Sequence, residues 1–141
     1  MNVFICTDGL FLRKRIEEIV ESYASMPNIN ITLNLSAASP QGLLRYLDIH
    51  PAKRALYILD ADIISEVDCL VFASKIRDSD TKGKIVILSA QTELHESIFE
   101  HAIEALDYIV KGDLEFLTVQ IKRCIETAYQ RFVSVGDHAQ A

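Results

Sequence analysis

Residues 55–62, A-L-Y-I-L-D-A-D, form an uninterrupted apolar run that ends at two acids separated by one residue. A run of this length is typical of a strand covered by helices on both faces, as in parallel sheets. Asp60 is therefore expected where a central strand leaves the core. Ligands bind at that carboxyl edge of open parallel sheets, so we expect the functional site of the chain there.

Four other short apolar runs alternate with amphipathic segments. The expected strands are Val3 to Cys6, Asn28 to Ser36, Ala55 to Asp60, Ile85 to Ala90 and Leu106 to Val110. Helical spacing of apolar residues predicts helices from Leu12 to Tyr23, from Ser39-Pro40 to a point before Pro51, through Val67 to Ile76, from Thr92 to His101, and after Asp113. This alternation of strand and helix predicts a parallel sheet with right-handed crossovers.

The second expected strand differs from the others because it alternates. Within residues 28–36, one face carries Ile29, Ile31, Leu33 and Leu35, and the other carries polar residues. One polar face is typical of an edge strand. The predicted fold class is therefore α/β: a flavodoxin-like (βα)5 doubly wound fold with a parallel five-stranded sheet in strand order 2-1-3-4-5.

Local signals define the helix ends and the extent of the domain. Ser39 and Pro40 combine a side-chain cap with proline at the first helical position, and Asp113 can cap the last helix. We expect one domain over residues 1–133 and a polar tail over residues 134–141. The residues of the third helix expected to face the core are Val67, Leu70, Val71 and Ser74, with Phe72 and Ile76 widening that face.

The composition argues against several classes of protein. The 141 residues suit one domain, and half of them are hydrophobic. A net charge of −6 argues against nucleic-acid binding, because phosphate backbones are bound by clustered Lys and Arg. Three cysteines without a C-x-x-C pair argue against disulfides and zinc and favour a reducing cytosol. No apolar run approaches the ~18–20 residues of a membrane span, and no signal peptide is recognisable, so we expect a soluble cytoplasmic protein.

Polar residues follow the expected strands at the edge where those strands end. They are Thr7 and Asp8 after the first strand, Asp60 and Asp62 at the third, Ser89 at the fourth and Lys111 after the fifth. Neighbouring carboxylates repel one another, and a hard cation such as Mg²⁺ relieves that repulsion. The ion and Lys111 together would neutralise a phosphoryl group. Asp60 is therefore the candidate nucleophile of an aspartyl phosphate, with Ser89 as a hydrogen-bond donor to the phosphoryl oxygens.

Each of these residues also has an ordinary structural interpretation. Acids at strand ends, such as Asp8, Asp60 and Asp62, are often solvated loop residues or helix caps. A serine such as Ser89 commonly closes a turn, and a lysine such as Lys111 is commonly no more than exposed. Only their coincidence at one edge of the sheet favours the functional hypothesis.

This constellation resembles the receiver domain of bacterial two-component response regulators, over residues 2–133. The motifs that carry the resemblance are the Asp8 loop, Leu59-Asp60, Ser89, and A-L-D-Y-I-V-K from Ala105 to Lys111. Three segments are similar to receivers of the accessory-gene-regulator type, the LytTR-class regulators of Gram-positive quorum sensing. They are Ser89 to Leu94, Glu104 to Ile109 and Cys124 to Ala128.

The resemblance implies a histidine kinase as phosphoryl donor to a chain that is not an enzyme in its own right but assists its own phosphotransfer. It also implies homodimerisation through the face of the fourth helix, fifth strand and fifth helix. No membrane partner is expected, and DNA is expected to contact only a LytTR domain absent from this chain, which would be an excised or a stand-alone receiver. The implied roles are phosphoacceptor for Asp60, Mg²⁺ ligands for Asp8, Asp60 and the backbone carbonyl of Asp62, switch for Ser89 and Tyr108, and phosphoryl partner for Lys111.

Two positions depart from the receiver pattern. Receivers usually carry two adjacent acids after the first strand, but here Thr7 precedes Asp8, which is expected to weaken Mg²⁺ binding and phosphotransfer. Many receivers have Lys-Pro with a cis bond after the fifth strand, where this chain has Lys111-Gly112. A cis bond without proline costs about 2.5–4 kcal/mol, so the geometry of that peptide is left open.

Two function hypotheses remain, and a third is disfavoured. The first is a phosphorylation-dependent switch for quorum-sensing transcription control. The second is a phosphorylation-independent pseudo-receiver that acts as a constitutive interaction or dimerisation module, for which Thr7 is the best support. A flavodoxin-type flavin binder needs a phosphate-cradling loop, whereas residues 7–10, T-D-G-L, offer one glycine and an acid that repels phosphate.

Overall fold

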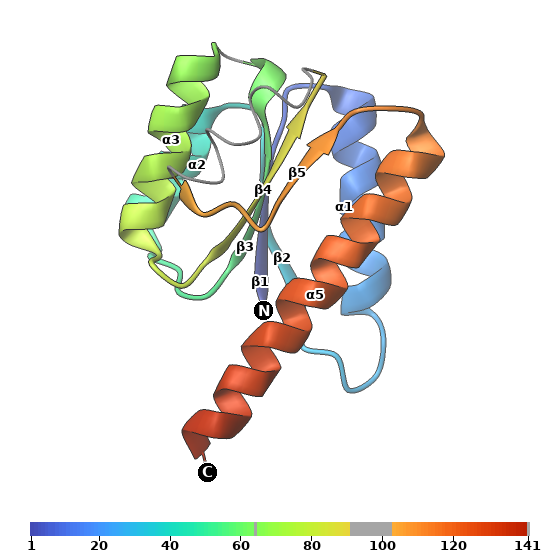
Figure 1. The fold of residues 1–141 in the computed structure, drawn as a ribbon, viewed down its shortest axis with the longest axis vertical. Helices are drawn as coiled ribbons and strands as arrows, with labels where there is room; N and C mark the ends of the chain where they lie inside the picture. The colour runs from blue at the N-terminus through green and yellow to red at the C-terminus, as the bar shows by residue number, and fades with distance from the viewer. Residues whose placement is uncertain (64, 91–102, 141) are drawn as a thin grey trace.

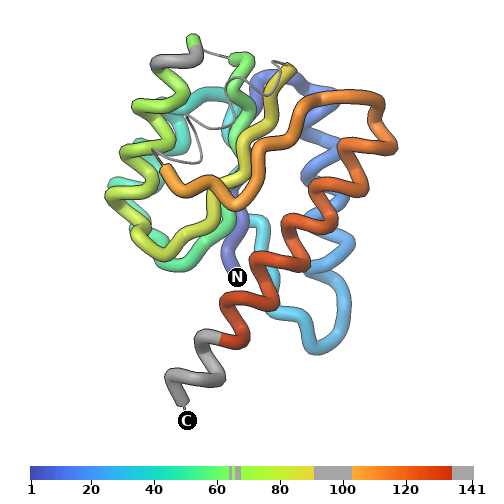
Figure 2. The backbone as a smooth tube through the Cα atoms, in the orientation of Figure 1, coloured from blue at the N-terminus to red at the C-terminus, as the bar shows by residue number. Residues whose placement is uncertain are grey.

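A computed structural model describes residues 1–63, 65–90 and 103–140, in which strands and helices alternate (Figure 1; Figure 2). The helix predicted from Thr92 to His101 lies outside the described residues. The elements are β1 (Asn2–Cys6), α1 (Leu10–Ala24), β2 (Thr32–Ala37), α2 (Pro40–Ile49), β3 (Leu56–Asp60), the 3-10 turn η1 (Ala61–Ile63), α3 (Glu66–Ser79), β4 (Lys84–Ser89), β5 (Asp107–Val110) and α5 (Leu114–Gln140).

The five strands form one parallel sheet in the order β2-β1-β3-β4-β5, which confirms the predicted fold. Figure 1 shows α2 and α3 over one face of the sheet and α1 and α5 over the other. The central strand β3 is buried along its whole length. Cover on both faces explains why β3 carries no polar residue before Asp60.

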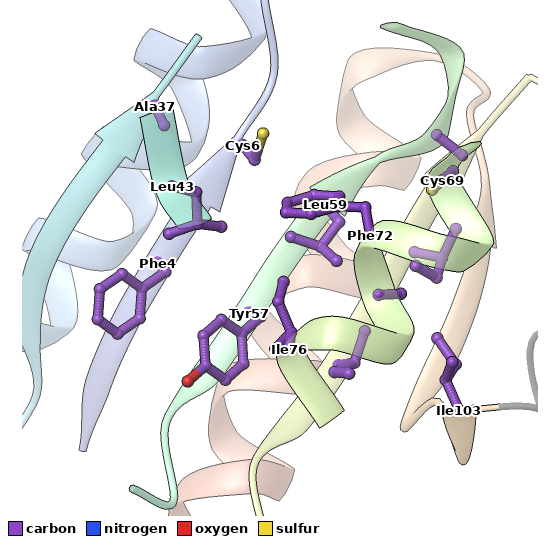
Figure 3. Close-up of a cluster of buried hydrophobic side chains, with 14 of the residues drawn as sticks. Phe4, Cys6, Ala37, Leu43, Tyr57, Leu59, Cys69, Phe72, Ile76 and Ile103 are labelled. Carbon is purple, nitrogen blue, oxygen red and sulfur yellow. The ribbon is translucent and has the colours of Figure 1, made fainter. Parts of the chain in front are cut away.

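Each face of the sheet has its own apolar core, because successive residues of a strand point to opposite faces. Along β3, Tyr57 and Leu59 pack with residues of α2 and α3, whereas Leu56 and Ile58 pack with residues of α1 and α5. In the first of these cores the rings of Phe4 and Tyr57 stack with their centroids 5.2 Å apart (Figure 3). The two cores hold β3 from both sides and so fix where it ends.

The strand β2 lies at the edge of the sheet, as predicted, but its residues do not share one inward face. A register shift pairs Val3 with Leu33 but Phe4 with Leu35, so Asn34 is an extra residue on β2. As a result, Leu33 packs in the core under α1 and α5, and Leu35 packs in the core under α2 and α3. The prediction of a single face was wrong because one inserted residue reverses the side on which later residues point.

The buried face of α3 also differs from the prediction. Phe72 and Ile76 are buried as predicted, but they share this face with Cys69 and Ala73, at the three- and four-residue spacing of one helix face. Val71, which was expected to face inward, is 49% exposed. It lies two positions from both Cys69 and Ala73, and two positions turn a helix by roughly 200° to the far side.

The predicted helix caps are present. The Ser39 hydroxyl accepts a hydrogen bond of 3.1 Å from the Gly42 N–H, and Asp113 Oδ1 accepts one of 2.8 Å from the Phe116 N–H. The helix α5 continues to Gln140, so the expected polar tail is helical over residues 134–140, where no proline interrupts it. In the part of the chain that the structure describes, no helix, α5 included, is both long and apolar enough for a bilayer span.

A buried carboxylate, that of Asp80, lies at the amino end of β3, just before β4 begins. Asp80 accepts hydrogen bonds from the backbone N–H groups of Arg54 (2.8 Å) and Ala55 (3.0 Å) and from the Tyr57 hydroxyl (2.9 Å). Burial and the negative charge of Asp80 raise the pKa of Tyr57. Gly83 lies against this carboxylate, and a Cβ atom there would be 2.7 Å from Asp80 Oδ2.

Candidate functional site

The strand register brings the predicted site residues to one edge of the sheet. Cys6 pairs with Leu59 across β1 and β3, and Asp60 pairs with Leu88 across β3 and β4. Ser89 then pairs with Val110 across β4 and β5. The residues that end or directly follow these strands therefore lie side by side: Thr7, Asp60, Ser89 and Lys111.

The Asp60 carboxylate is buried and has a protein donor on each oxygen. It is 6% exposed at the end of β3. Oδ1 accepts hydrogen bonds from Lys111 Nζ at 2.8 Å and from the backbone N–H of Asp62 at 2.9 Å. Oδ2 accepts a hydrogen bond of 2.7 Å from the Thr7 hydroxyl. A buried carboxylate is stable only when it is paired and hydrogen-bonded, and this one is both.

The Lys111 ammonium group is shared by two carboxylates. Besides Asp60, it lies 2.9 Å from Asp62 Oδ2. Burial lowers the pKa of Lys111, but hydrogen bonds to Asp60 and Asp62 outweigh burial and raise it above its usual value. The group is therefore a fixed positive charge at the sheet edge. The Lys111–Gly112 peptide is trans, as are all peptide bonds between the described residues.

Asp62 was predicted at this edge of the sheet, where the resemblance assigned a role only to its backbone carbonyl, but its side chain takes part in the site as well. Its carboxylate accepts hydrogen bonds from the Ser89 hydroxyl at 3.2 Å and from the Ala90 N–H at 2.8 Å. Burial raises the pKa of Asp62, and the bonds from Lys111, the Ala90 N–H and Ser89 lower it by more. The carboxylate of Asp62 thus links the switch candidate Ser89 to the Lys111–Asp60 pair.

Thr7 lies at this edge of the sheet, as its position after the first strand predicted, but no hydrogen bond to Asp60 was expected of it. The residue is fully buried, and its backbone N–H donates to the Ala37 carbonyl at 3.0 Å, which fixes it at the end of β1. Its hydroxyl also accepts a hydrogen bond of 3.3 Å from the Gly9 N–H. The neighbouring positions of β1 and β3 in the sheet were the one available signal that Thr7 would meet Asp60.

Asp8, the predicted Mg²⁺ ligand, is exposed next to this site. Burial raises the pKa of the Cys6 thiol to about 12, and the negative charges of Asp60 and Asp8 add to that shift, so both carboxylates lie near the same sulfur. No hydrogen bond from the described residues reaches the Asp8 carboxylate. It is therefore free to face a cation.

The donor set fits Mg²⁺ with few protein ligands. A carboxylate oxygen has about two lone-pair sites, so Asp60 Oδ2 keeps one for a cation while Thr7 occupies the other. Mg²⁺ usually keeps several waters and takes only one or two carboxylates from the protein, which Asp8 and Asp60 can supply. No group of three His, Cys, Asp or Glu side chains within the described residues is arranged to hold a metal. The set is therefore sparse, as the substitution of Thr7 for an acid suggested.

The second switch candidate, Tyr108, lies on the same face of the sheet as Ser89. Tyr108 pairs with Ile87 across β4 and β5, and Ser89 is two residues further along β4. The Tyr108 side chain is 7% exposed and packs in the core shared with α2 and α3. Of the predicted dimer face, β5 and α5 belong to the described residues, and the fourth helix does not. On α5, the apolar side chains of Phe116 and Val119 are exposed.

No protein-family model matches the chain, but sequence relatives exist. The chain is 28% identical to accessory gene regulator protein A of Staphylococcus epidermidis over 135 residues, which cover 93% of this chain and 55% of that protein. The protein of the same name from Staphylococcus aureus strain N315 is 27% identical over the same length and coverage. The chain therefore spans about half the length of the curated relatives that it matches.

Several solved structures that share this fold are response regulators or their receiver domains. The signal receiver domain of the putative response regulator NarL from Mycobacterium tuberculosis matches with a TM-score of 0.67 and 15% identity, over 92% of this chain and 95% of that one. An atypical orphan response regulator, whose structure revealed a phosphorylation-independent regulatory mechanism, matches with a TM-score of 0.61 and 19% identity, over 89% and 96%. A chain from the complex of the CheA3 P1 domain with CheY6 of R. sphaeroides matches with a TM-score of 0.62 and 21% identity, over 90% and 95%.

Proposed function

We propose that this chain, a response-regulator receiver domain similar to accessory gene regulator A, accepts a phosphoryl group on Asp60. The contact of 2.8 Å between Lys111 Nζ and Asp60 Oδ1 is the observation that carries the proposal. A carboxylate nucleophile that receives a phosphoryl group needs a fixed positive charge beside it. Lys111 supplies that charge at the carboxyl edge of the sheet.

In the proposed transfer, a carboxylate oxygen of Asp60 attacks the phosphorus of a phosphohistidine on a histidine kinase. The new oxygen–phosphorus bond forms as the phosphorus–nitrogen bond breaks, and the imidazole of the kinase keeps the electron pair. The raised pKa of Lys111 keeps its ammonium group charged at neutral pH, where it stabilises the negative oxygens of the transferred group. The chain is thus a phosphoacceptor that assists its own modification.

Asp8, Asp60 and the backbone carbonyl of Asp62 are the groups that would hold Mg²⁺. When bound, the ion would neutralise part of the negative charge that the phosphoryl group brings to the site. The protein's own contribution is the position of these oxygens. Asp60 is the last residue of β3, and Asp62 lies in the turn η1 that directly follows it. The Thr7 hydroxyl holds Asp60 Oδ2 in place while the carboxylate awaits the phosphoryl group.

The output of the proposed switch begins with an exchange of partners. A phosphoryl group on Asp60 attracts Lys111 and the Ser89 hydroxyl, which both contact Asp62 before phosphorylation. Tyr108 lies on the same sheet face and follows Ser89. The face formed by the fourth helix, β5 and α5 then changes and homodimerises. Small shifts of this kind become an output when a packed interface has two discrete arrangements.

One observation favours a second candidate function, a pseudo-receiver that takes no phosphoryl group. Thr7 occupies Asp60 Oδ2 at 2.7 Å, and Lys111 with the Asp62 N–H occupies Oδ1, so the protein satisfies the carboxylate without any ligand. One structural neighbour is an atypical orphan response regulator with a phosphorylation-independent regulatory mechanism. In this alternative the chain is a constitutive interaction or dimerisation module.

A phosphodonor experiment separates the two candidates. The protein is incubated with Mg²⁺ and acetyl phosphate, and its intact mass is measured over time. We expect the mass of one added phosphoryl group in the parent and in an Asp48→Asn control, which removes an exposed carboxylate on α2. We expect no addition in Asp60→Asn. An unmodified parent under conditions that modify another receiver would favour the pseudo-receiver.

The proposed cellular role is quorum-sensing transcription control, by analogy with the accessory gene regulator A relatives. A cytoplasmic histidine kinase domain is the expected phosphoryl donor. The net charge of −6 disfavours direct contact with DNA by this chain. DNA binding would then belong to a further domain, since the chain spans about half the length of these relatives.

A further inference from the structure

A basic pocket lies at the amino end of the sheet, at the opposite end from Asp60. Its volume is about 330 Å³, and three separate parts of the chain build it. They are Arg54 just before β3, the loop before β4 with the first residue of that strand, and residues 131–132 of α5. Figure 1 shows α5 running past the end of the sheet at which β1 begins. The residues that line the pocket are Arg54, Thr81, Lys82, Lys84, Arg131 and Phe132.

The aromatic ring of Phe132 organises the cations of this pocket. The guanidinium carbon of Arg54 lies 5.3 Å from the centre of the ring, and Lys84 Nζ lies 5.8 Å from it. Arg54 also donates a hydrogen bond of 2.5 Å to the Phe132 carbonyl. Cations within about 6 Å of a ring face are attracted to it. Arg54 and Lys84 are therefore held beside the pocket rather than extended into solvent.

Positive charge in this pocket is poorly compensated. Its described lining residues include four cations and no acid, and Lys53 lines an adjoining cavity together with Arg54. Asp80, which lies nearby, uses its carboxylate on Arg54 N–H, Ala55 N–H and the Tyr57 hydroxyl. Five of the 14 basic residues thus gather at one end of a chain whose net charge is −6.

The pKa of Lys84 is lowered, as expected for a partly buried lysine among other positive charges. Burial lowers its pKa, and the positive charges of Arg131, Arg77 and Arg54 lower it further. The negative charge of Glu104 acts on it in the opposite direction and does not reverse the shift. Like charges held together in this way destabilise one another, and a bound anion relieves the repulsion.

We infer that this pocket binds a small polyphosphorylated anion, a di- or triphosphate group that is either free or part of a nucleotide. Several cations that surround one pocket match several closely spaced negative oxygens, and the Thr81 hydroxyl adds a neutral donor. The volume suits a small ligand. A long polyanion such as nucleic acid is disfavoured because the rest of the molecule is acidic. The inference does not depend on the chemistry of Asp60.

The test uses the whole 141-residue chain, labelled with ¹⁵N and titrated with inorganic tripolyphosphate in the absence of Mg²⁺. We expect saturable shifts at the amides around Arg54, Lys82 and Phe132, and none at the Asp60 edge. The variant Lys82→Gln/Arg131→Gln removes two exposed cations of the pocket. It is expected to bind at least about tenfold more weakly. The matched control is Lys75→Gln/Lys122→Gln, which removes two exposed lysines elsewhere and should bind like the parent.

Every outcome of this titration decides the inference. Equal weakening in the pocket variant and in the matched control would overturn it, because binding would then follow net charge alone. Shifts that gather around Lys111 would also overturn it, as would binding of a DNA duplex without binding of tripolyphosphate. Titration with ATP separates the sources of the phosphate group. Affinity equal to tripolyphosphate indicates recognition of the phosphates only, and tighter binding indicates that the nucleoside contributes as well.

Discussion

The Thr7 hydroxyl donates a hydrogen bond of 2.7 Å to Asp60 Oδ2 across the end of the central strands. Both residues are buried, so this bond satisfies a carboxylate oxygen that has little access to water. Where receivers usually carry an acid, this chain has a neutral donor. That single exchange lowers the negative charge of the site and stabilises the carboxylate in the absence of a cation.

The contribution of this bond can be measured with Thr7→Val, which preserves the shape of the side chain and removes the hydroxyl. Hydrogen bonds to charged groups contribute roughly 1.5–3 kcal/mol, and we expect the free energy of unfolding in urea to fall by that amount. Thr7→Ser keeps the donor and should retain most of the stability. A Thr7→Val protein as stable as the parent would show that the bond makes no net contribution to the free energy of unfolding.

Restoring the missing acid should have the opposite consequences for metal and for stability. Thr7→Asp adds a carboxylate beside Asp60 and Asp8, so we expect Mg²⁺ to bind about tenfold more tightly in calorimetric titration, since affinity follows the charge of the ligand set. Without Mg²⁺, the same variant should unfold at a lower temperature, because two buried acids repel. Unchanged Mg²⁺ affinity would place the cation away from Thr7.

Lys111 is expected to act on the phosphoryl group more than on the fold. Lys111→Ala should slow modification by acetyl phosphate about a hundredfold, comparable with the loss of one donor to a developing charge in other enzymes. The variant should still unfold cooperatively, because Lys111 lies at the strand exit and is partly exposed. Lys75→Ala, at an exposed site on α3, is the control. A modification rate like that of the parent would remove Lys111 from the mechanism.

The lowered pKa of Asp62 predicts a dependence of stability on pH. Asp62 titrates below its usual value of 3.8 in the folded protein, so it stabilises the fold above that pH and loses the contribution as the pH falls through the folded value. The difference in unfolding free energy between the parent and Asp62→Asn should therefore shrink below about pH 4. A difference that stays constant from neutral pH to pH 3 would contradict the assignment.

Gly83 tests the structural carboxylate at the other end of the sheet. A Cβ atom there would lie 2.7 Å from Asp80 Oδ2 and 3.0 Å from the Tyr57 ring, and neither group can move freely because they bond to each other. We expect Gly83→Ala to destabilise the protein by roughly 1–3 kcal/mol in chemical denaturation. At Gly9 the nearest atoms would be 3.7 Å away, so Gly9→Ala should change stability little. Equal effects would refute the packing argument.

The sequence predicted the sheet and the meeting of Asp60 with Lys111, because buried parallel strands have a distinct apolar pattern and their order fixes which loops adjoin. It did not predict which of these side chains form hydrogen bonds with one another. The contact between Thr7 and Asp60 depends on the register of β1 against β3, and the bonds of the Asp62 carboxylate depend on the turn η1. Periodicity carries neither kind of information.

The errors in the fold have local causes. One extra residue in β2 sent Leu33 and Leu35 to opposite faces, although a strict alternation in the sequence suggested one face. In α3, several apolar residues are adjacent in sequence, so the pattern was compatible with a buried face centred on Val71. In the structure, the buried face is the one that carries Cys69 and Ile76. The basic pocket could not be predicted because its residues are spread from Arg54 to Phe132.

The most direct test of the central claim is a ¹⁵N NMR titration with beryllofluoride and Mg²⁺, which together imitate a phosphorylated aspartate. We expect shifts at the amides of Asp60, Ser89 and Lys111 that spread to Tyr108 in the parent and are absent in Asp60→Asn. A parent spectrum that does not change, or changes equally in Asp60→Asn, would contradict the proposal that Asp60 is the phosphoacceptor.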